Sequence, residues 1–358
     1  QTVLVPMSMS RLLFITQKVD KDDDVLGVYH RWIDELAKKV EQISVICLYQ
    51  GRTELPINVQ VFSLRKEYGS NRWSRVFLFY KYIWILRKDY SSVFVHMNPI
   101  YILLGGLFWK LSGKRILFWY NHPFGNITAR IGIALADKVF CTSPYSFSAR
   151  YKKTSLMPAG IDTVFFKRDP NITRKENRIL YLGRISLIKN IDCLIEAAKI
   201  LEQKRMEFEF LIVGSPSSDM DKIYEKRLRV VAKDLINSGR IVFRLSVPHN
   251  KTPEIYNSSG IFVNLTPAGS FDKTILEAMA SELLILVSNR AFGNILGEEL
   301  GRLCLFEENN VLDLVGKIKL LLALDPAKKL ELGGQLRETV VQHHCLAKLL
   351  TALAAELA

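Results

Sequence analysis

Two stretches in the second half of the chain carry residue types that bind anions and sugars. The first reads YLGRISLIKN, in which Gly183 follows an apolar run and Arg184 and Lys189 supply two cations. A glycine at that point lets the backbone turn tightly, and two cations beside the beginning of a helix suit a diphosphate. A pair of solvated surface charges is the competing interpretation.

The second stretch reads PAGSFDKTILEAMA and begins where another apolar run ends. Its small residues form a loop that opens a helix, so that backbone N–H groups can bind an anion. Glu277 falls one turn inside that helix, where its carboxylate can accept hydrogen bonds from ribose hydroxyls. A solvated glutamate that stabilises the helix dipole is the alternative.

The elements that must position these residues form a regular alternation of apolar, strand-length runs and helical patterns. Short Val-, Ile-, Leu- and Phe-rich strands separated by helices are typical of parallel sheets covered on both faces. The alternation breaks at residues 167–178 (KRDPNITRKENR), a charged stretch with a proline that we interpret as a linker. We therefore predict two doubly wound α/β domains, 11–166 and 167–340, with ligands in a cleft at the carboxyl ends of the strands. Residues 341–358 are expected to form a helix that packs back towards the first domain.

The same patterns predict individual elements in each domain. In the first domain we expect strands at 11–16, 44–48, 93–96, 115–120 and 138–142, and helices at 27–40, 71–88, 100–111 and 126–135. In the second domain we expect strands at 179–182, 209–213, 241–243, 261–264 and 284–288, and helices at 188–202, 221–236 and 273–281. Three closing helices follow, and residues 1–10 are interpreted as an unstructured lead-in.

Composition limits the class of protein. The chain has 358 residues, of which 49% are hydrophobic and 24% are charged, and this excludes disordered, collagen-like and coiled-coil classes. The longest apolar run, residues 99–109, is about half of the ~20 residues that a membrane-spanning helix needs. The 5 cysteines are scattered, odd in number and without a CxxC pair, which indicates a reducing cytoplasm.

The net charge of +13 is unevenly distributed, because residues 1–168 contain twice as many basic as acidic residues. Such an excess favours an anionic partner for the first half: a membrane surface, a nucleic acid or a phosphorylated substrate. Solubility alone is the alternative interpretation. No nucleic-acid-binding module is recognisable, so we expect no nucleic-acid partner.

Residues 71–88 combine aromatic and basic side chains at helical spacing. Four aromatic residues, Trp73, Phe77, Tyr80 and Trp84, recur on one face of the predicted helix. Basic residues flank them: Arg72, Arg75, Lys81, Arg87 and Lys88. This combination suits the interface of an anionic membrane. A buried aromatic stripe with a solvated opposite face is the alternative.

Together these motifs resemble the family 4 retaining glycosyltransferases of GT-B fold, over residues 11–358. In the second half the resemblance rests on YLGRISLIKNIDCLIEAAKIL, FLIVGS and FVNLTPAGSFDKTILEAMAS. In the first half it rests on ADKVFCTSPYSF, MPAGIDTVFF, FVHMNPIYILLGG and ILFWYNHP. The resemblance implies two Rossmann-like domains facing a central cleft. It also implies sugar transfer from a nucleotide-diphosphate sugar of UDP or GDP type, with retention of configuration and no cofactor.

The resemblance also assigns roles to single residues. Arg184 and Lys189 match the pair that holds the donor diphosphate, and Glu277 matches the glutamate that holds the nucleotide ribose. His122 falls where the family keeps a histidine near the transferred sugar, although a loop or buried histidine is the alternative. The other matched donor-site positions are Gly27, Gly183, Gly269, Ser270, Phe271, Asp272 and Lys273.

One position departs from the family pattern. Gly269 stands where the family has the first glutamate of its Glu-x7-Glu motif, which contacts sugar hydroxyls. Asp272 or Lys273 is a candidate replacement. The departure makes a degenerate, non-catalytic binding protein the alternative function, and a sugar-nucleotide epimerase of GT-B fold is another. The cofactor-lysine signature of a phosphorylase is not found.

We therefore expect a retaining, metal-independent glycosyltransferase whose acceptor is a glycan or a lipid-linked glycan. Its product is expected to be a cell-surface polysaccharide or lipid-linked glycan, made in the cytoplasm by a protein peripherally bound to the inner face of the membrane. The acidic run 22–24 is interpreted as a helix cap rather than a metal site. The run His343-His344-Cys345 has no further ligands at metal-binding spacing, and is interpreted as an interruption or the beginning of the last helix.

Overall fold

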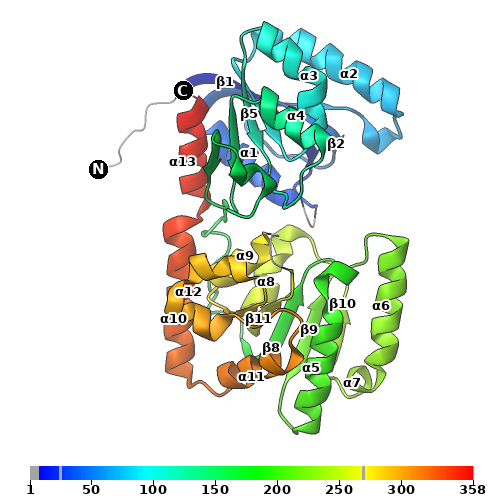
Figure 1. The fold of residues 1–358 in the computed structure, drawn as a ribbon, viewed down its shortest axis with the longest axis vertical. Helices are drawn as coiled ribbons and strands as arrows, with labels where there is room; N and C mark the ends of the chain where they lie inside the picture. The colour runs from blue at the N-terminus through cyan, green and yellow to red at the C-terminus, as the bar shows by residue number, and fades with distance from the viewer. Residues whose placement is uncertain (1–7, 24–25, 268–270, 358) are drawn as a thin grey trace. The chain divides into compact units, whose positions relative to one another are not determined.

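The computed structural model describes residues 8–23, 26–267 and 271–357, and its contacts divide the chain into two units. Unit 1 comprises the chain up to Gly160, the segment Pro248–Asn250 and the chain from Leu346 onwards. Unit 2 comprises Ile161–Val247 and Lys251–Cys345. Each unit is built on one parallel sheet with helices packed against it (Figure 1).

The described residues of unit 1 form seven strands and five α-helices. The strands are β1 (Ser8–Val19), β2 (Val40–Gln50), β3 (Val59–Ser63), β4 (Ser92–His96), β5 (Arg115–Trp119), β6 (Lys138–Cys141) and β7 (Thr154–Leu156). Their order in the sheet is β3-β2-β1-β4-β5-β6-β7, and every pair is parallel. The helices are α1 (Gly27–Ala37), α2 (Arg72–Ile85), α3 (Ile100–Leu111), α4 (Ile127–Leu135) and α13 (Leu346–Leu357).

Strand β1 shows why its sequence is apolar without alternation. Successive side chains of a strand point to opposite faces, and here both faces are covered. Leu12 and Phe14 pack in the core beneath α1 and α13, whereas Leu13 and Ile15 pack in the core beneath α2, α3 and α4. All four side chains are buried.

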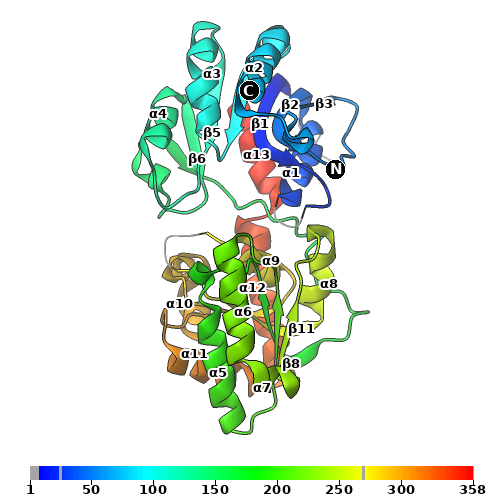
Figure 2. The same cartoon turned by 90° about the vertical axis from the view of Figure 1, so that its right-hand side faces the viewer.

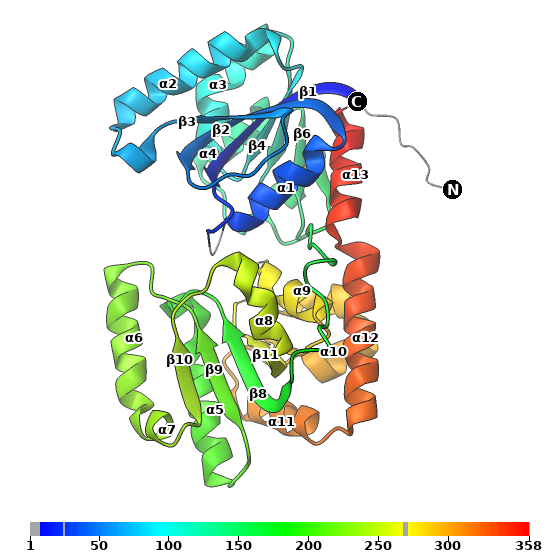
Figure 3. The ribbon, with the colours of Figure 1, turned by 180° about the vertical axis from the view of Figure 1, so that it is seen from behind.

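Helix α13 completes the first of these two cores, although it is far from the rest of unit 1 in sequence. It lies beside α1 (Figure 3). Its leucines at 346, 349, 350, 353 and 357 pack into the cluster that contains Trp32. At its end, Glu356 pairs with Arg115 of β5 at 2.8 Å.

The described residues of unit 2 form five strands and eight α-helices. The strands are β8 (Lys175–Leu182), β9 (Glu209–Val213), β10 (Ile241–Arg244), β11 (Ser259–Asn264) and β12 (Leu284–Val287). Their order is β10-β9-β8-β11-β12, again all parallel. The helices are α5 (Ile191–Gln203), α6 (Asp219–Val231), α7 (Lys233–Asn237), α8 (Thr252–Asn257), α9 (Lys273–Ala280), α10 (Gly293–Cys304), α11 (Val311–Leu322) and α12 (Pro326–His343). Helices α5 and α6 lie side by side (Figure 2).

The expected linker at 167–178 is wrong in its second half, where β8 begins at Lys175. The charges of this segment are compatible with a central strand because Lys175 and Arg178 both pair with Glu209 of β9, at 3.0 and 2.5 Å. The first half is also fixed to unit 2, since the Asn257 side chain donates to the Lys167 carbonyl and accepts from the Asp169 N–H.

Several other expectations need correction. The helix expected at 221–236 is two helices, α6 and α7, and the three closing helices are four, α10 to α13. Strands β3 and β7 and helix α8 were not expected, because each has only three to six residues. Residues 8–10 of the expected lead-in belong to β1, and residues 1–7 lie outside the described part of the chain.

Short 3-10 helices are η1 (Lys66–Tyr68), η2 (Leu86–Lys88), η3 (Phe147–Arg150), η4 (Leu187–Lys189), η5 (His249–Lys251) and η6 (Arg290–Phe292).

Gly160 is required where the main part of unit 1 ends. Its φ is +75°, and its carbonyl accepts a hydrogen bond from Trp32 Nε1 at 3.2 Å. A Cβ at this position would lie 2.4 Å from Leu349 Cδ2 and 2.8 Å from Trp32 Cζ2. We predict that Gly160→Ala lowers the free energy of unfolding by about 2–4 kcal/mol, from left-handed strain and overpacking together.

The matched control is Gly113→Ala, where φ is +67° but no atom lies within 4 Å of the new Cβ. This variant carries only the backbone strain, about 1–2 kcal/mol. Urea denaturation of both variants measures the difference. Equal losses would mean that the contact of Gly160 with Trp32 and Leu349 is not tight.

Candidate active site

The two anion-binding motifs meet at the carboxyl edge of the unit 2 sheet. Strands β8 and β11 are neighbours, so the turn that follows Leu182 and the loop that follows Asn264 lie together. The turn at Gly183 is held by close packing on Gly214, after β9. The Gly183 N–H donates to the Val213 carbonyl, and a Cβ on Gly214 would lie 1.9 Å from the Gly183 oxygen.

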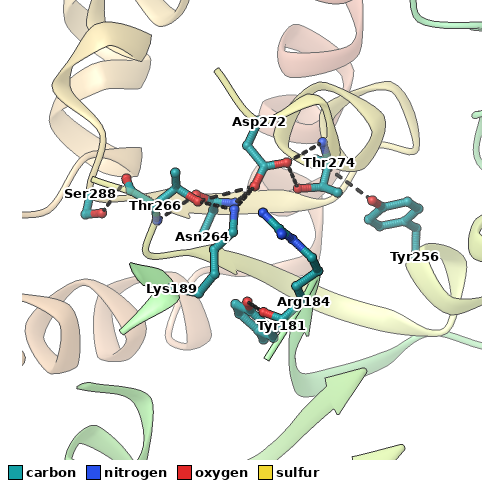
Figure 4. A network of polar contacts seen from close by, with 9 residues as sticks. All are labelled: Tyr181, Arg184, Lys189, Tyr256, Asn264, Thr266, Asp272, Thr274 and Ser288. Carbon is teal, nitrogen blue, oxygen red and sulfur yellow. Dashed lines mark hydrogen bonds and ion pairs between the residues drawn. The ribbon is translucent and has the colours of Figure 1, made fainter. Parts of the chain in front are cut away.

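Asp272 is the centre of the polar network at this edge (Figure 4). Its Oδ2 accepts from Lys189 Nζ at 2.7 Å, Asn264 Nδ2 at 3.0 Å and Thr266 Oγ1 at 3.2 Å. Its Oδ1 accepts from the Thr274 hydroxyl at 2.7 Å and the Thr274 N–H at 3.2 Å, which caps α9. Burial opposes ionisation, but Lys189 and the hydroxyl and amide donors outweigh it and hold the pKa of Asp272 well below its usual range.

The two predicted diphosphate ligands differ in their surroundings. Lys189 is largely buried, and its Nζ also donates to Thr266 Oγ1 at 2.8 Å. Arg184 is exposed, and its side chain extends towards the same network (Figure 4). Its carbonyl accepts from the Tyr181 hydroxyl at 2.8 Å, which fixes the turn. Among the described residues, the Arg184 guanidinium makes no ion pair within 4.0 Å.

Glu277 lies one turn inside α9 and is buried, with 5% of its surface exposed. Its Oε2 accepts a hydrogen bond from the Tyr256 hydroxyl of α8 at 2.9 Å. Burial and the neighbouring Glu277 carboxylate raise the pKa of Tyr256, so this phenol is a permanent donor. The glutamate predicted to bind ribose is thus oriented by a residue of another helix.

Lys273, at the beginning of α9, has its Nζ buried. Burial lowers the pKa of this ammonium from 10.5 to about 7, and the Glu277 carboxylate offsets only part of the effect. Phe271 precedes it and stacks on Phe292, with ring centroids 5.4 Å apart. Gly269 and Ser270 lie outside the described residues.

The two predicted site residues of unit 1 follow strands that end at the same edge of that sheet. Gly27 is the buried first residue of α1, after β1. His122 comes after β5 and is exposed, with its ring beside Tyr120 and its carbonyl accepting from the Phe147 N–H at 2.8 Å. The backbone of His122 is therefore fixed while its imidazole is accessible to solvent.

Sequence reasoning missed four polar residues of the site, Tyr256, Asn264, Thr266 and Thr274. For Asn264 and Thr266 a signal existed, because NLT directly follows the apolar run of β11 at the edge where ligands bind. Tyr256 had no such signal, since α8 was not expected.

Described residues of the acidic run 22–24 and of the run His343-His344-Cys345 make contacts that stabilise the fold. Asp23 pairs with Lys18 at 2.5 Å and caps the turn before α1, while Asp24 is outside the described residues. His344 lies between α12 and α13, where its carbonyl accepts from the Ile161 N–H. Burial lowers the pKa of His344 to about 4. Within residues 8–23, 26–267 and 271–357, no group of three or more His, Cys, Asp or Glu side chains could hold a metal ion.

The aromatic face of α2 is exposed, so the interpretation of Trp73, Phe77, Tyr80 and Trp84 as a core stripe is wrong. Trp73 is 83% and Phe77 69% exposed, whereas the neighbouring positions Phe79 and Ile83 are buried. The exposed face continues onto α3, because the Tyr80 hydroxyl donates to the Leu104 carbonyl and Trp84 lies against Phe108. We name this face the α2–α4 surface; its exposed apolar residues are Trp73, Phe77, Tyr80, Trp84, Leu103, Leu107, Leu111, Ile127 and Ile131.

Comparison with known proteins supports the resemblance. Residues 162–336 match the family model described as Glycosyl transferases group 1. The chain is 24% identical over 255 residues to the amylovoran biosynthesis glycosyltransferase AmsD of Erwinia amylovora, covering 66% of this chain and 68% of that protein. It is 26% identical over 163 residues to mannosylfructose-phosphate synthase of Agrobacterium fabrum, covering 40% of this chain and 36% of that protein.

Among solved structures, HepE of Anabaena in complex with UDP and glucose aligns with a TM-score of 0.76 and 16% identity. The alignment covers 97% of this chain and 99% of HepE. The match over residues 162–336, just under half of the chain, agrees with the predicted resemblance to the group 1 glycosyltransferases. The likeness to HepE and the two parallel α/β units confirm the GT-B fold class. The narrower family 4 assignment stays a prediction.

The buried ammonium of Lys273 predicts a pH dependence of stability. Between its folded pKa of about 7 and its ordinary value of 10.5, the unfolded chain binds the proton and the folded chain does not. Raising the pH through this window therefore favours folding, by up to about 1.4 kcal/mol per pH unit. We predict that Lys273→Met flattens the dependence of unfolding free energy on pH between 7 and 10.

Urea denaturation at several pH values measures these slopes. Lys222→Met is the matched control, because Lys222 is 62% exposed on α6. If Lys273→Met left the wild-type slope unchanged, the lowered pKa would not belong to Lys273.

Proposed function

We propose that this chain, whose residues 162–336 match the family model of the group 1 glycosyltransferases, transfers a sugar from a nucleoside-diphosphate sugar to a glycan or lipid-linked acceptor. The observation that carries the proposal is the cluster at the carboxyl edge of the unit 2 sheet. There Lys189 and the exposed Arg184 lie beside the beginning of α9, one turn before the buried Glu277. We infer a donor of UDP type, which the complexes of HepE with UDP and sugar support.

The chemistry requires stabilisation of a leaving group. Breaking the bond between the sugar and the diphosphate makes the diphosphate more negative while the sugar becomes oxocarbenium-like. Arg184, Lys189 and the backbone N–H groups of the loop before α9 would stabilise the diphosphate, since preorganised donors act most strongly where charge develops. No pair of catalytic carboxylates is needed, unlike in a glycoside hydrolase.

The finer features of the reaction are also proposals. We infer retention of anomeric configuration, with the acceptor entering on the face that the diphosphate leaves and a phosphate oxygen taking its proton. We infer that no metal takes part, and that the guanidinium of Arg184, the remaining N–H of Lys189 and the backbone N–H groups at the beginning of α9 stabilise the diphosphate instead. Glu277 would hold the ribose, while His122 and Gly27 would act near the transferred sugar and the acceptor.

Gly269 motivates the alternative function, a degenerate binding protein that holds nucleotide without turnover. We infer that Asp272 does not replace the missing glutamate, because its two oxygens already accept five hydrogen bonds and a carboxylate offers about four lone-pair sites. A transfer assay separates the functions, since a degenerate protein binds UDP but forms no glycoside. An epimerase would convert the donor without any acceptor.

We extend the proposal to the inner face of an anionic membrane, where lipid-linked acceptors and cell-surface polysaccharides are made. The α2–α4 surface combines exposed Trp, Phe and Leu side chains with basic residues, and helices α2, α3 and α4 contain no acidic residue. Amphipathic aromatic and basic side chains of this kind bind the headgroup region of anionic bilayers. No helix among the described residues is long and apolar enough to cross a membrane.

Donor binding and turnover make separable predictions. Arg184→Ala is expected to lower kcat of sugar transfer by about 10²–10³, because it removes one preorganised donor to the leaving group.

Glu277→Ala is expected to weaken UDP binding, measured by calorimetry. A thermal-shift screen of the wild type against UDP, GDP, ADP and TDP identifies the base, because a ligand that binds only the folded state stabilises it.

Arg302→Ala serves as the control, since Arg302 is 76% exposed on α10 and pairs only with Glu298 of the same helix among the described residues. Absence of any thermal shift would remove the donor-binding proposal. UDP affinity that Glu277→Ala leaves unchanged would remove the ribose role.

Membrane binding is tested by flotation with phosphatidylcholine vesicles that contain or lack phosphatidylglycerol. The triple variant Arg72→Ser, Arg75→Ser, Lys81→Ser is expected to bind anionic vesicles roughly 100-fold more weakly, at about 1 kcal/mol per basic residue. The control is Lys222→Ser, Lys226→Ser, Arg229→Ser on α6 of unit 2. Equal binding of the wild type to neutral and anionic vesicles would refute the proposal.

A further inference from the structure

Asp272 places a negative charge directly on Lys189, one of the two residues proposed to bind the donor diphosphate. We infer that Asp272 is a positioning residue that acts through Lys189: it holds the ammonium in one orientation and keeps the phosphate site partly neutralised. This inference rests on the proposed function.

The geometry shows how the ammonium is held. An ammonium has three N–H donors, and two of those of Lys189 go to Asp272 Oδ2 at 2.7 Å and Thr266 Oγ1 at 2.8 Å. Within the described residues, the third has no protein acceptor. Only 14% of the Lys189 side chain is exposed, so its long stem has little freedom. One N–H is therefore presented to a phosphate oxygen in a fixed direction.

Asp272 is itself fixed by residues that are independent of Lys189. Thr274 donates to its Oδ1 through both the hydroxyl and the backbone N–H, and Asn264 donates to its Oδ2. Only 16% of the Asp272 side chain is exposed. The carboxylate thus stays in place when an anion arrives, and the anion meets an ion pair rather than a free cation.

This arrangement has opposite effects on binding and on turnover. The carboxylate repels the diphosphate of the substrate and of the product nucleotide, so it weakens affinity and favours product release. At the same time it preorganises Lys189 for the moment at which the leaving group gains charge, and preorganised donors raise kcat. Removing the charge of Asp272 should therefore tighten UDP binding while slowing transfer.

A helix cap alone would behave differently. Asp272 caps α9 through Thr274, so a purely structural role would change stability without a dependence on Lys189. The two roles are separated by a double-mutant cycle of Asp272→Asn and Lys189→Met, because the amide keeps an acceptor for Thr274 but has no charge.

The cycle is measured with UDP by calorimetry and with sugar transfer by steady-state kinetics. Asp272→Asn in the wild type is expected to lower the Kd for UDP about tenfold and to lower kcat at least tenfold. In the Lys189→Met background, the same substitution is expected to change residual kcat less than twofold, whereas UDP binding still tightens because the carboxylate repels the diphosphate directly. Asp325→Asn is the matched control, because Asp325 caps α12 in the same way through the Lys328 N–H.

An equal effect of Asp272→Asn on kcat in both backgrounds, or no effect on Kd and kcat in the wild type, would overturn the inference. If Asp272→Asn folds but is too unstable for kinetic assays, the cycle is read from urea midpoints. Recovery of stability in the double variant supports action through Lys189, and its absence overturns it. Failure of the wild type to bind UDP is a different result, because it refutes the proposed donor site itself.

Discussion

The parallel pairing of β8 with β11 at the centre of the unit 2 sheet is the contact on which the proposed donor site depends. It aligns Ile179 with Ile261 and Leu180 with Phe262, so both strands end at the same edge. Lys189, which follows the turn at Gly183, can then donate hydrogen bonds to Thr266 and Asp272 although many residues separate them. A slip of one residue would send every side chain of β11 to the other face of the sheet, and Asn264 would no longer reach Asp272.

Charge in a partly buried site is the second constraint. Isolated charges are costly to remove from water, so buried charges occur with partners. Here the chain supplies them in pairs: Lys189 with Asp272, and Glu277 with the Tyr256 hydroxyl. Burial also lowers the pKa of the Lys273 ammonium. The site is consequently less positive than its count of basic residues suggests, and of its three described cations Arg184, Lys189 and Lys273, Arg184 is the exposed one.

The sequence predicts this protein unevenly, for physical reasons. Long apolar strands such as β1 and β11 are visible as patterns because both faces of their sheets are buried. The short edge strands β3 and β7 and helix α8 are not, since each has six residues or fewer and is too short to show a period. Arg184, Lys189 and Glu277 could be proposed from type and spacing. The pairing of Lys189 with Asp272 could not, because it depends on side-chain directions that only the assembled sheet determines. For α2, periodicity identified an aromatic stripe but not its exposure, because Phe79 and Ile83 form an equally apolar stripe beside it.

Helix α13 has a consequence for how the chain is made. Its leucines close the core around Trp32, yet the ribosome synthesises them only after all of unit 2. At about 5–20 residues per second, the nascent first unit therefore exposes this apolar face for on the order of ten seconds or more. During biosynthesis the second unit can finish folding first, and the earlier half of the polypeptide must be protected from aggregation until the last helix emerges.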